Sequence, residues 1–547
     1  MKSFNHSRSP AWVGAKETAL NTAASHRAIA LHATSVLAAA ALLTACANPS
    51  QLPASSDACT SLKGQSLGQQ QATITDAKLV PETGNVPAHC AVNITLQDST
   101  LRVEARLPTT GWNGKLVALG GGGLKGAVFV PTLPFFSPSI IAERYATIAT
   151  NGGYDYATRD AGYFKAEFAY DPIKFADYTN LSIHRALPLG KELVSRFYGT
   201  PAKKNYFEGC SAGGHEAMML SQRFPGDFDG IVARAPAGNF MGVFLQFNHV
   251  AKASRAPGGT LNTAKQQLLG KAVLQQCDAM DGLADGIVSK PAACNFDPAT
   301  LRCAGGADAG DQCLSDAQIR TVRAAATGFK TSDGAWSHPG VNWGGEDNAT
   351  KGWGEYLWPL APAPFSGQPL AALFSDGFVR SFVTRDPGYD PTQFNPDEWR
   401  AALNIVGTTF NAFNPDLSAL RARGVKMILW NGQQDTAVSP KDTARYYDAV
   451  VQKMGQPAAD ETVELFLAPG VGHCFGGPGP DRVDLMKALV AWSDQGTPPS
   501  RQGIVLTQLD SAGKPVATRP MCKHPAYPRY NGGGDPKAAA SFICSTN

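Results

Sequence analysis

The stretch Gly209–Gly213, Gly-Cys-Ser-Ala-Gly, constrains the fold of this chain more than any other. An apolar pair ending at Phe207 precedes it, and Ala217, Met218 and Leu220 follow with the spacing of one helix face. Glycines on both sides of the serine permit a sharp turn, because larger side chains there would collide with the neighbouring strand and helix. The pattern therefore predicts a strand, a strained turn that exposes the serine hydroxyl, and a helix.

Strand-like and helix-like patterns alternate on both sides of this turn. Helical spacing over Tyr178–Phe197 leads into it, and alternating stretches within Thr73–Leu107 predict antiparallel strands. Strands that alternate with helices indicate an α/β fold with a mostly parallel sheet. Buried strands are predicted at Lys115–Leu119, Ala146–Thr150, Phe228–Ala235, Val425–Trp430 and Thr462–Leu467.

The alternation stops between about Asn239 and Asp416, where the chain is rich in Gly, Pro, Trp and Cys. An irregular insertion of this length is typical of a lid domain. We therefore predict a main α/β domain in two parts, residues 57–238 and 417–547, with a lid at 239–416.

Two polar residues follow the last two predicted strands. Val425–Trp430 leads to Asp435, and Thr462–Leu467 leads to His473, so both fall at carboxyl ends of strands, where open α/β sheets place their sites. A serine nucleophile needs a base, and the base needs an acid to orient it. The chain order Ser, Asp, His is that of the α/β-hydrolase fold. We therefore predict this fold, with Ser211, Asp435 and His473 as catalytic residues.

The glycine run Gly120–Gly123 follows a predicted strand and allows backbone N–H groups to approach a substrate carbonyl closely. We predict an oxyanion hole made of the N–H groups of Ala212 and Gly123. The alternatives are a flexible turn and a nucleotide-phosphate loop, which the lack of a following Lys-Ser/Thr disfavours. His215 is the main rival as catalytic base, but on the helix it should face away from the serine or line the wall.

The composition is that of a globular protein. The chain has 547 residues, is 43% apolar and carries a net charge of +3, so nothing predicts a nucleic-acid partner. Arg27 precedes the apolar run Ala28–Leu43, which suits a signal peptide and is short for a membrane span. No later segment has 18 uninterrupted apolar residues, so the mature protein is expected not to span a membrane.

The sequence Leu43–Cys46, Leu-Thr-Ala-Cys, resembles a bacterial lipobox, in which Cys46 is lipidated and becomes the mature N-terminus. The alternative is ordinary cleavage of the signal peptide near the same place. We predict a signal peptide with lipobox at 1–46, a tether at 47–56, and a periplasmic, outer-membrane or secreted protein whose only membrane contact is the lipid anchor. The oligomeric state stays open.

Ten cysteines remain besides Cys46, an even number that favours disulfides in an exported chain. Spacing alone cannot choose among the pairings. Cys210 directly precedes the serine and Cys474 directly follows the histidine, so a disulfide between them would hold nucleophile and base in register.

Cys-Ser, Asp and His-Cys in this order resemble the tannase/feruloyl esterase family. The resemblance extends over the mature chain and includes Arg223–Ala233, Asp442–Tyr447, Gly472–Gly479 and Arg519–Cys522. It implies a carboxylesterase for aromatic acyl esters with a structural Ca²⁺ in the lid. It also implies the disulfide Cys210–Cys474 and the further disulfides Cys59–Cys90, Cys277–Cys294, Cys303–Cys313 and Cys522–Cys544.

An acidic loop in the predicted lid carries Asp278, Asp281 and Asp285 within eight residues. Ca²⁺ binds six to eight oxygen ligands, and carboxylates this dense need a cation or full solvation. The spacing is not that of an EF-hand. The resemblance assigns Ca²⁺ to the three carboxylates and to the carbonyls of Leu283 and Ile287; the alternative is a solvated acidic loop.

The sequence predicts an exported serine carboxylesterase acting on feruloyl, galloyl or related hydroxybenzoyl esters. The alternative chemistry is hydrolysis of terephthalate monoesters such as mono(2-hydroxyethyl) terephthalate, in which Arg380 would meet the substrate carboxylate. A non-catalytic surface binding protein on the same scaffold and a peptidase are further alternatives. Four lid aromatics are candidates for stacking on the acyl ring, or else form the lid core: Trp343, Trp353, Trp358 and Phe382.

Overall fold

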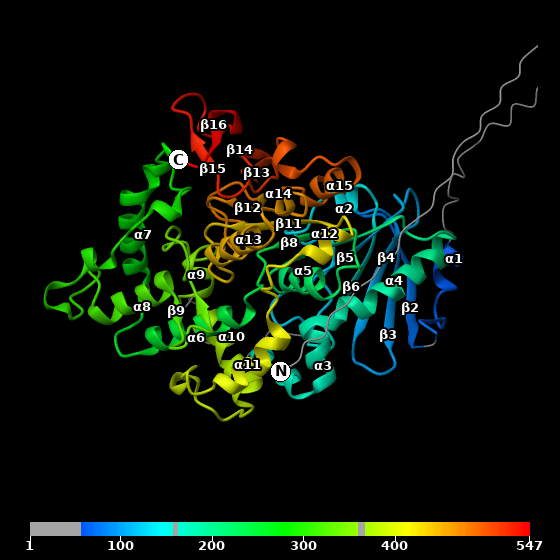
Figure 1. Cartoon of the computed structure of the whole chain (residues 1–547), viewed down its shortest axis with the longest axis horizontal. Coiled ribbons are helices and arrows are strands. Elements are labelled where there is room, and N and C mark those ends of the chain that lie inside the picture. Colours follow the sequence, from blue (N-terminus) through cyan, green and yellow to red (C-terminus); the bar gives the residue numbers. More distant parts are fainter. Residues whose placement is uncertain (1–55, 70, 157–161, 359–366) are drawn as a thin grey trace, which may run out of the picture. The chain divides into compact units, whose positions relative to one another are not determined.

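A ten-stranded sheet forms the centre of the structure (Figure 1). The computed structural model describes residues 56–547 except 70, 157–161 and 359–366. The predicted signal peptide, Cys46 and the tether up to residue 55 lie outside the described residues. The described residues all belong to one compact unit.

The sheet has the strand order β1-β2-β3-β4-β6-β5-β7-β8-β11-β12. Its first four strands pair antiparallel with one another and with β6, and the six strands from β6 to β12 are parallel. The strands are β1 (Ser66–Leu67), β2 (Ala72–Val80), β3 (His89–Leu96), β4 (Arg102–Pro108), β5 (Lys115–Leu119), β6 (Ala146–Thr150), β7 (Lys204–Cys210), β8 (Gly230–Arg234), β11 (Lys426–Gly432) and β12 (Val463–Ala468).

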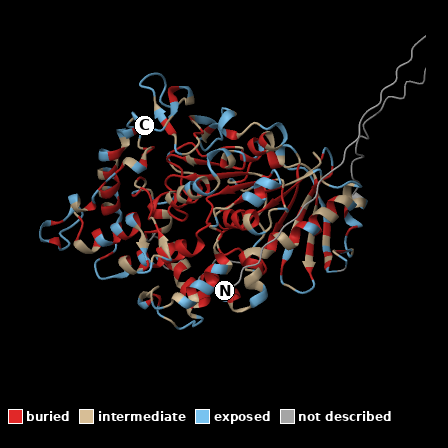
Figure 2. Cartoon of the chain, viewed as in Figure 1, coloured by how far each residue is buried: buried red, intermediate tan, exposed pale blue. Residues whose placement is uncertain are grey.

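Burial explains the two kinds of strand in this sheet. The antiparallel strands β3 and β4 largely alternate between buried residues and half-buried or exposed ones, whereas β6 and β8 are buried along their whole length (Figure 2). Parallel strands covered by helices on both faces read as continuous apolar runs. The predicted strands at 115–119 and 146–150 match β5 and β6, and the other three differ from β8, β11 and β12 by one or two residues at each end. The predicted α/β class is confirmed.

Helices cover both faces of the sheet. On one face, α4, α5, α13 and α14 contribute to a core with β2–β4 and β11, and on the other α2 and α15 form a second core. The helices outside the predicted insertion are α1 (Ser56–Thr60), α2 (Ser139–Ala142), α3 (Pro172–Ala176), α4 (Ser182–Tyr198), α5 (Ala212–Arg223), α12 (Ser418–Ala422), α13 (Pro440–Met454), α14 (Gln456–Asp460) and α15 (Leu485–Gln495).

The insertion between β8 and β11 is mainly helical (Figure 1). Its core includes Phe240 and Phe382 and continues into Cys210 at the end of β7 and Ala235 just after β8. The insertion therefore packs directly on the sheet, within one compact unit. Its elements are α6 (Phe240–Arg255), α7 (Thr263–Cys277), α8 (Asp316–Thr327), β9 (Phe329–Lys330), β10 (Ser337–His338), α9 (Trp353–Tyr356), α10 (Leu370–Gly377), a π-helix (Phe378–Thr384) and α11 (Arg400–Phe410).

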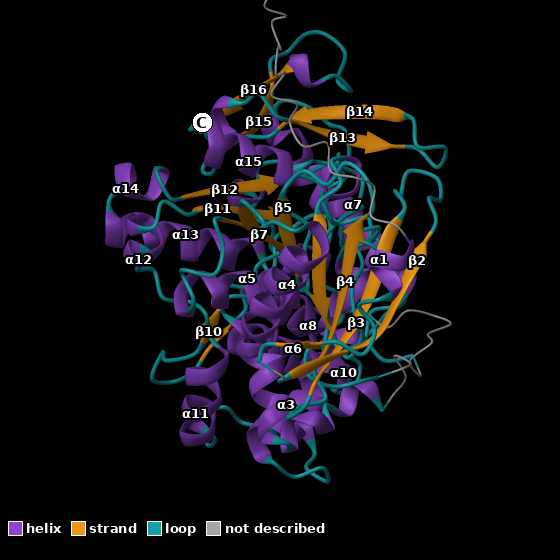
Figure 3. Ribbon diagram, turned by 90° about the vertical axis from the view of Figure 1, so that its right-hand side faces the viewer, coloured by secondary structure: helices purple, strands orange, loops and turns teal. Residues whose placement is uncertain are grey.

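Two hairpins follow α15 beyond the end of the sheet (Figure 3). They consist of β13 (Val505–Leu509) with β14 (Pro515–Pro520), and β15 (Tyr527–Tyr530) with β16 (Phe542–Ser545). Leu506 and Met521 pack into the second core, which joins this segment to the sheet. Within the described part of the chain, no helix combines the length and hydropathy needed to cross a bilayer.

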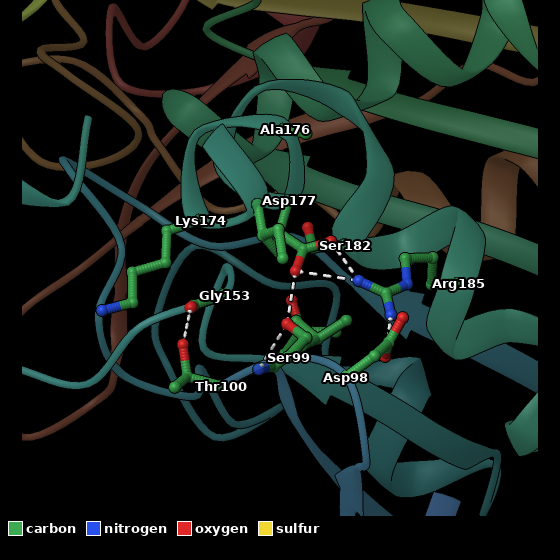
Figure 4. A network of polar contacts seen from close by, with 12 residues as sticks. Asp98, Ser99, Thr100, Gly153, Lys174, Ala176, Asp177, Ser182 and Arg185 are labelled. Atoms are coloured by element: carbon green, nitrogen blue, oxygen red, sulfur yellow. Dashed lines mark hydrogen bonds and ion pairs between the residues drawn. The ribbon is translucent and has the colours of Figure 1, made fainter. Parts of the chain in front are cut away.

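A buried carboxylate joins the β3–β4 turn to the segment before α4 (Figure 4). Asp177 lies in a π-helix (Asp177–Leu181), is fully buried, and accepts hydrogen bonds from Ser99 Oγ at 2.6 Å and Arg185 Nη1 at 2.9 Å. Arg185 Nη2 also contacts Asp98 at 2.6 Å. This network fixes the main chain at Tyr178, whose carbonyl accepts a hydrogen bond from Lys125 Nζ at 2.6 Å.

Candidate active site

Ser211 lies at the turn between β7 and α5, as the sequence predicts. Its φ is +64° and its ψ is −118°, a region that side chains rarely occupy, so the turn is strained. A Cβ at Gly209 would lie 2.6 Å from the carbonyl carbon of Gly213, and a Cβ at Gly213 would lie 2.7 Å from Gly121 O. The two glycines are therefore required by direct contact between the helix, the strand and the glycine run.

His473 and Asp435 lie in the loops after β12 and β11 and contact each other. His473 Nδ1 is 2.9 Å from Asp435 Oδ2, and Asp435 is fully buried. The other oxygen, Oδ1, accepts hydrogen bonds from the N–H groups of Ala437 at 2.9 Å and Val438 at 2.8 Å. Burial lowers the pKa of His473, but the charge and hydrogen bond of Asp435 together with the charge of Glu355 outweigh burial and raise that pKa above its ordinary value.

A disulfide joins the two loops that carry Ser211 and His473. Cys210 and Cys474 are 264 residues apart in sequence, and their Cα atoms are 6.0 Å apart. The remaining cysteines pair as the family resemblance implies, in the disulfides Cys59–Cys90, Cys277–Cys294, Cys303–Cys313 and Cys522–Cys544. Disulfides persist in oxidising compartments, so five of them indicate an exported protein.

Ser211 and His473 line one cavity of about 210 Å³. A smaller apolar pocket adjoins it and shares Gly123, Ser211, Tyr356 and Phe374 with it. The wall of the larger cavity is rich in aromatic and aliphatic side chains, namely Phe129, Phe135, Tyr163, Phe164, Tyr356, Leu370, Phe374 and Phe475. A cavity of this size and lining suits an aromatic ring.

The predicted oxyanion donors border these spaces. Gly123 lines both pockets, and Ala212, the first residue of α5, lines the smaller one. Gly123 has a φ of +58°, and a Cβ there would lie 2.6 Å from Tyr163 Oη, so only glycine fits. Neither N–H donates to a protein acceptor among the described residues. Both are therefore available to a substrate oxygen beside Ser211.

A buried ion pair holds the glycine run in place through a hydrogen bond to Gly121. Lys125 Nζ is 2.7 Å from Glu216 Oε1 and donates to Tyr178 O at 2.6 Å. Glu216 Oε2 accepts from Gly121 N–H at 2.9 Å, and Oε1 accepts from Ser182 Oγ at 3.1 Å. The hydrogen bond between Glu216 and the glycine run has no local sequence signal, because the two partners are 95 residues apart.

A family model described as tannase and feruloyl esterase matches residues 90–545. The chain belongs to the tannase and feruloyl esterase family. It is 33% identical to the mono(2-hydroxyethyl) terephthalate hydrolase of Piscinibacter sakaiensis, over 90% of this chain and 92% of that protein. It is 30% identical to a probable feruloyl esterase B of Emericella nidulans, over 82% and 83% of the two chains.

Solved structures agree on the fold. Feruloyl esterase B from Aspergillus oryzae superposes with a TM-score of 0.77 at 24% identity, covering 90% of this chain and all of that one. Tannin acyl hydrolase from Aspergillus niger gives a TM-score of 0.69 at 19% identity, covering 90% and 95%. The predicted α/β-hydrolase fold is confirmed, and the family relatives confirm that this chain is a carboxylic ester hydrolase for small esters.

His215 of this tannase-family chain is a buried structural residue. Its Nε2 contacts Phe410 O at 2.7 Å, and its ring packs against Phe240 with centroids 4.4 Å apart. Burial lowers the pKa of His215 to about 3, so the ring is neutral at physiological pH. It lines neither pocket at Ser211 among the described residues.

The lid aromatics singled out in the sequence are core residues. Trp353, Trp358 and Phe382 are buried, and Trp343 stacks on Trp353 with centroids 5.6 Å apart. None of them lines the cavity in the described chain, nor does Arg380, whose Nε donates to a main-chain carbonyl. Tyr356 and Phe374 take the lining positions, and sequence periodicity does not distinguish such residues from core aromatics.

The acidic loop of the lid is held mainly by its own main chain. Asp278 accepts hydrogen bonds from the N–H groups of Asp285, Gly286 and Ile287 at 2.9–3.3 Å, and Asp285 Oδ2 contacts Arg519 Nη2 at 2.6 Å. Burial raises the pKa of both Asp281 and Asp285, and the neighbouring carboxylates raise it further. A cation would relieve this repulsion.

This loop offers only oxygen donors, which suits Ca²⁺ and not Zn²⁺. Among residues 56–547, apart from the gaps, no three His, Cys, Asp or Glu side chains converge on a point that could hold a metal. A cation at this loop therefore needs the main-chain carbonyls of Leu283 and Ile287 as well as the carboxylates. Calcium stays a prediction.

Proposed function

We propose that this chain is an exported serine carboxylesterase that hydrolyses aromatic acyl esters through an acyl-enzyme. The observation that supports it best is that His473, hydrogen-bonded to the buried Asp435, lines the same cavity as Ser211 and is tied to it by the Cys210–Cys474 disulfide. A base with an orienting acid beside a strained, accessible serine is the arrangement that acyl transfer needs.

The proposed reaction has two halves. His473 Nε2 takes the Ser211 proton as Oγ attacks the ester carbonyl, and the N–H groups of Ala212 and Gly123 stabilise the oxyanion. Asp435 holds the imidazole by its Nδ1 and stabilises the imidazolium. The imidazolium then gives its proton to the alcohol oxygen as the ester C–O bond breaks. Water, activated by the same imidazole, releases the aromatic acid and restores Ser211.

The charges in the cavity favour a neutral acyl ring. Lys351 is the one cation among the described lining residues, and its Nζ is already paired with Glu355 Oε1 at 3.0 Å. A substrate carboxylate would have to compete for that cation, and Arg380 lies elsewhere. Feruloyl, galloyl or related hydroxybenzoyl esters are therefore the proposed substrates, ahead of the terephthalate monoesters named for the Piscinibacter relative.

The test is acid release from methyl ferulate, methyl gallate and mono(2-hydroxyethyl) terephthalate by the purified chain. The phenolic esters should give the higher kcat/KM, and Ser211→Ala should abolish release while leaving the fold intact by circular dichroism. A higher kcat/KM for the terephthalate monoester would reverse the substrate order, and activity retained in Ser211→Ala would overturn the mechanism.

We also propose that Asp278, Asp281, Asp285 and the carbonyls of Leu283 and Ile287 hold a structural Ca²⁺. When bound, the ion would neutralise the acidic loop and stabilise the lid, with no part in acyl transfer. Calorimetric titration of the chelator-treated chain with Ca²⁺ measures this binding directly. A lipid anchor on Cys46 remains a separate proposal, tested by the mass of the mature N-terminal peptide.

A further inference from the structure

A second cavity lies beside the one at Ser211. Its volume is about 450 Å³, larger than the cavity at Ser211 and within the range of small-molecule sites. Among the described residues, only Cys474 lines both cavities. Phe135 lines the cavity at Ser211, whereas its neighbour Phe136 lines the second one. The two cavities are therefore separate spaces that meet at Cys474.

The wall of the second cavity is mainly apolar. The segment that leads into α2 supplies three prolines and an aromatic ring, and β13 supplies two aliphatic side chains. These residues are Pro131, Pro134, Phe136, Pro138, Val505 and Leu509. Proline rings and a phenylalanine ring form flat, rigid surfaces, which suit a planar aromatic ligand.

A buried guanidinium group lines this apolar wall. Arg234, at the end of β8, is 2% exposed, and its Nε donates to Glu208 Oε1 at 2.7 Å. Its Nη2 donates to Ser137 Oγ at 3.2 Å and to Val483 O at 3.1 Å, between residues that line the cavity. Its Nη1 donates to no acceptor among the described residues. A buried N–H donor without an acceptor indicates a missing partner.

A second guanidinium group lines the same cavity. Arg482 is 39% exposed, and its Nη1 donates to Pro134 O at 2.8 Å. Its Nε is 3.6 Å from Asp481 Oδ2, and its Nη2 has no acceptor in the described part of the chain. The main chain of Arg482 is fixed by two hydrogen bonds with Thr507 of β13, at 2.9 and 3.0 Å.

The acidic side chains of the cavity are already engaged by hydrogen-bond donors. Asp481 Oδ2 accepts from Gly476 N–H at 2.8 Å. Asp484 accepts from Ser139 Oγ at 2.7 Å and from the N–H groups of Ser139 and Lys487 at 3.0 and 2.9 Å. The hydrogen-bonding capacity that remains is therefore on the two arginines, which are donors only.

These groups together determine the chemistry of a ligand. The arginines require an acceptor, and a carboxylate is the acceptor that matches the planar guanidinium fork. The apolar wall requires a ring or a hydrocarbon group next to that carboxylate. We propose that the second cavity is a binding site for a small aromatic carboxylate, held through Arg234 and Arg482 and separate from the site at Ser211. This inference does not depend on the proposed function, because it involves no catalytic step.

The first experiment locates the ligand in the wild-type chain and needs no substitution. The photoreactive acid 4-benzoylbenzoate is irradiated with the protein, and mass spectrometry of the peptides identifies the labelled residues. Label is expected within residues 131–141 or 505–509, and excess benzoate should suppress it. Label only on residues that line the cavity at Ser211 would overturn the proposal.

The second experiment measures affinity by calorimetric titration with benzoate and with benzamide, which has the same ring without the charge. Benzoate should bind with a Kd of about 0.1–1 mM, at least about 10-fold more tightly than benzamide. Arg482→Met should remove this preference. Arg529→Met, at an exposed position on β15, should keep it.

A cavity-filling variant separates this site from the one at Ser211. Leu509 and Val516 lie on the two strands of one hairpin and are 39% and 41% exposed, but only Leu509 lines the cavity among the described residues. Leu509→Trp should abolish the binding of benzoate at the second cavity, and Val516→Trp should preserve it. Benzoate binding that is unchanged in both Leu509→Trp and Arg482→Met would overturn the proposal, as would equal affinity of wild type for benzoate and benzamide.

Discussion

Glu346, a carboxyl group in the insertion, allows a quantitative test of how burial couples stability to pH. It is fully buried, its Oε1 accepts a hydrogen bond from Gly344 N–H at 2.7 Å, and its Oε2 has no partner among the described residues. No cation pairs with it in the described chain. Burial raises the pKa of Glu346 from 4.5 to about 8, so the carboxyl is protonated in the folded protein near pH 7.

The raised pKa predicts how stability depends on pH. Between pH 4.5 and 8 the unfolded chain loses this proton while the folded chain keeps it, so the free energy of unfolding falls as the pH rises. One pKa unit corresponds to about 1.4 kcal/mol, so the loss from this group approaches about 5 kcal/mol at pH 8. Glu346→Gln keeps the acceptor for Gly344 and removes the titration.

The assay is denaturant unfolding of wild type and Glu346→Gln at several pH values. The two should have similar stability near pH 4.5, and the variant should become progressively more stable than wild type, by up to about 5 kcal/mol at pH 8. The difference between the two free energies of unfolding removes the contribution of all other titrating groups. As a control, Glu82→Gln at an exposed position should show the same pH dependence of stability as wild type. A difference that stays constant from pH 4.5 to 8 would refute the reasoning.

Three further predictions concern the site and the loop. Lys125→Met should lower the free energy of unfolding by about 3–5 kcal/mol, because it leaves the Glu216 carboxylate buried without its cation. Adding Glu216→Gln should recover part of the lost free energy. A loss below about 1 kcal/mol in Lys125→Met would contradict a stabilising role for the ion pair. On the acid side, kcat/KM should decrease as the pH falls through the pKa of His473, which lies above 6.5, because protonated His473 cannot accept the serine proton. A kcat/KM that stays constant from pH 5 to 8 would contradict this assignment. Removing calcium with a chelator should lower the midpoint temperature of thermal unfolding, and Asp281→Asn should abolish the effect of added Ca²⁺. A midpoint temperature that does not change with the chelator would argue for a solvated loop.

Local pattern was sufficient for the central part of the fold. The strands at 115–119 and 146–150 were predicted to the residue, because buried parallel strands read as short apolar runs bounded by turn residues. The turn at Ser211 was also predictable, because a positive φ flanked by close backbone contacts needs small residues at fixed offsets. Asp435 and His473 could be chosen because the carboxyl ends of parallel strands meet at one edge.

The lining of the cavity was not predictable in the same way. Four aromatic residues were candidates for the acyl pocket, and three of them, Trp353, Trp358 and Phe382, are buried in the lid core. Tyr356 and Phe374 line the cavity instead, although they lie on short helices close to those residues in sequence. Core and cavity aromatics have the same composition and spacing, so only the packing of the insertion distinguishes them.

The sequence by itself determined the sheet, the strained serine turn, and the chain order of serine, acid and histidine, because each depends on periodicity or backbone conformation within a few residues. Only the tertiary structure decided which side chains surround the serine. Lys125 meets Glu216 across 91 residues, and Lys351 reaches the His473 loop across more than a hundred. Contacts of this range are set by how segments distant in the sequence pack on one another, and no local pattern encodes them.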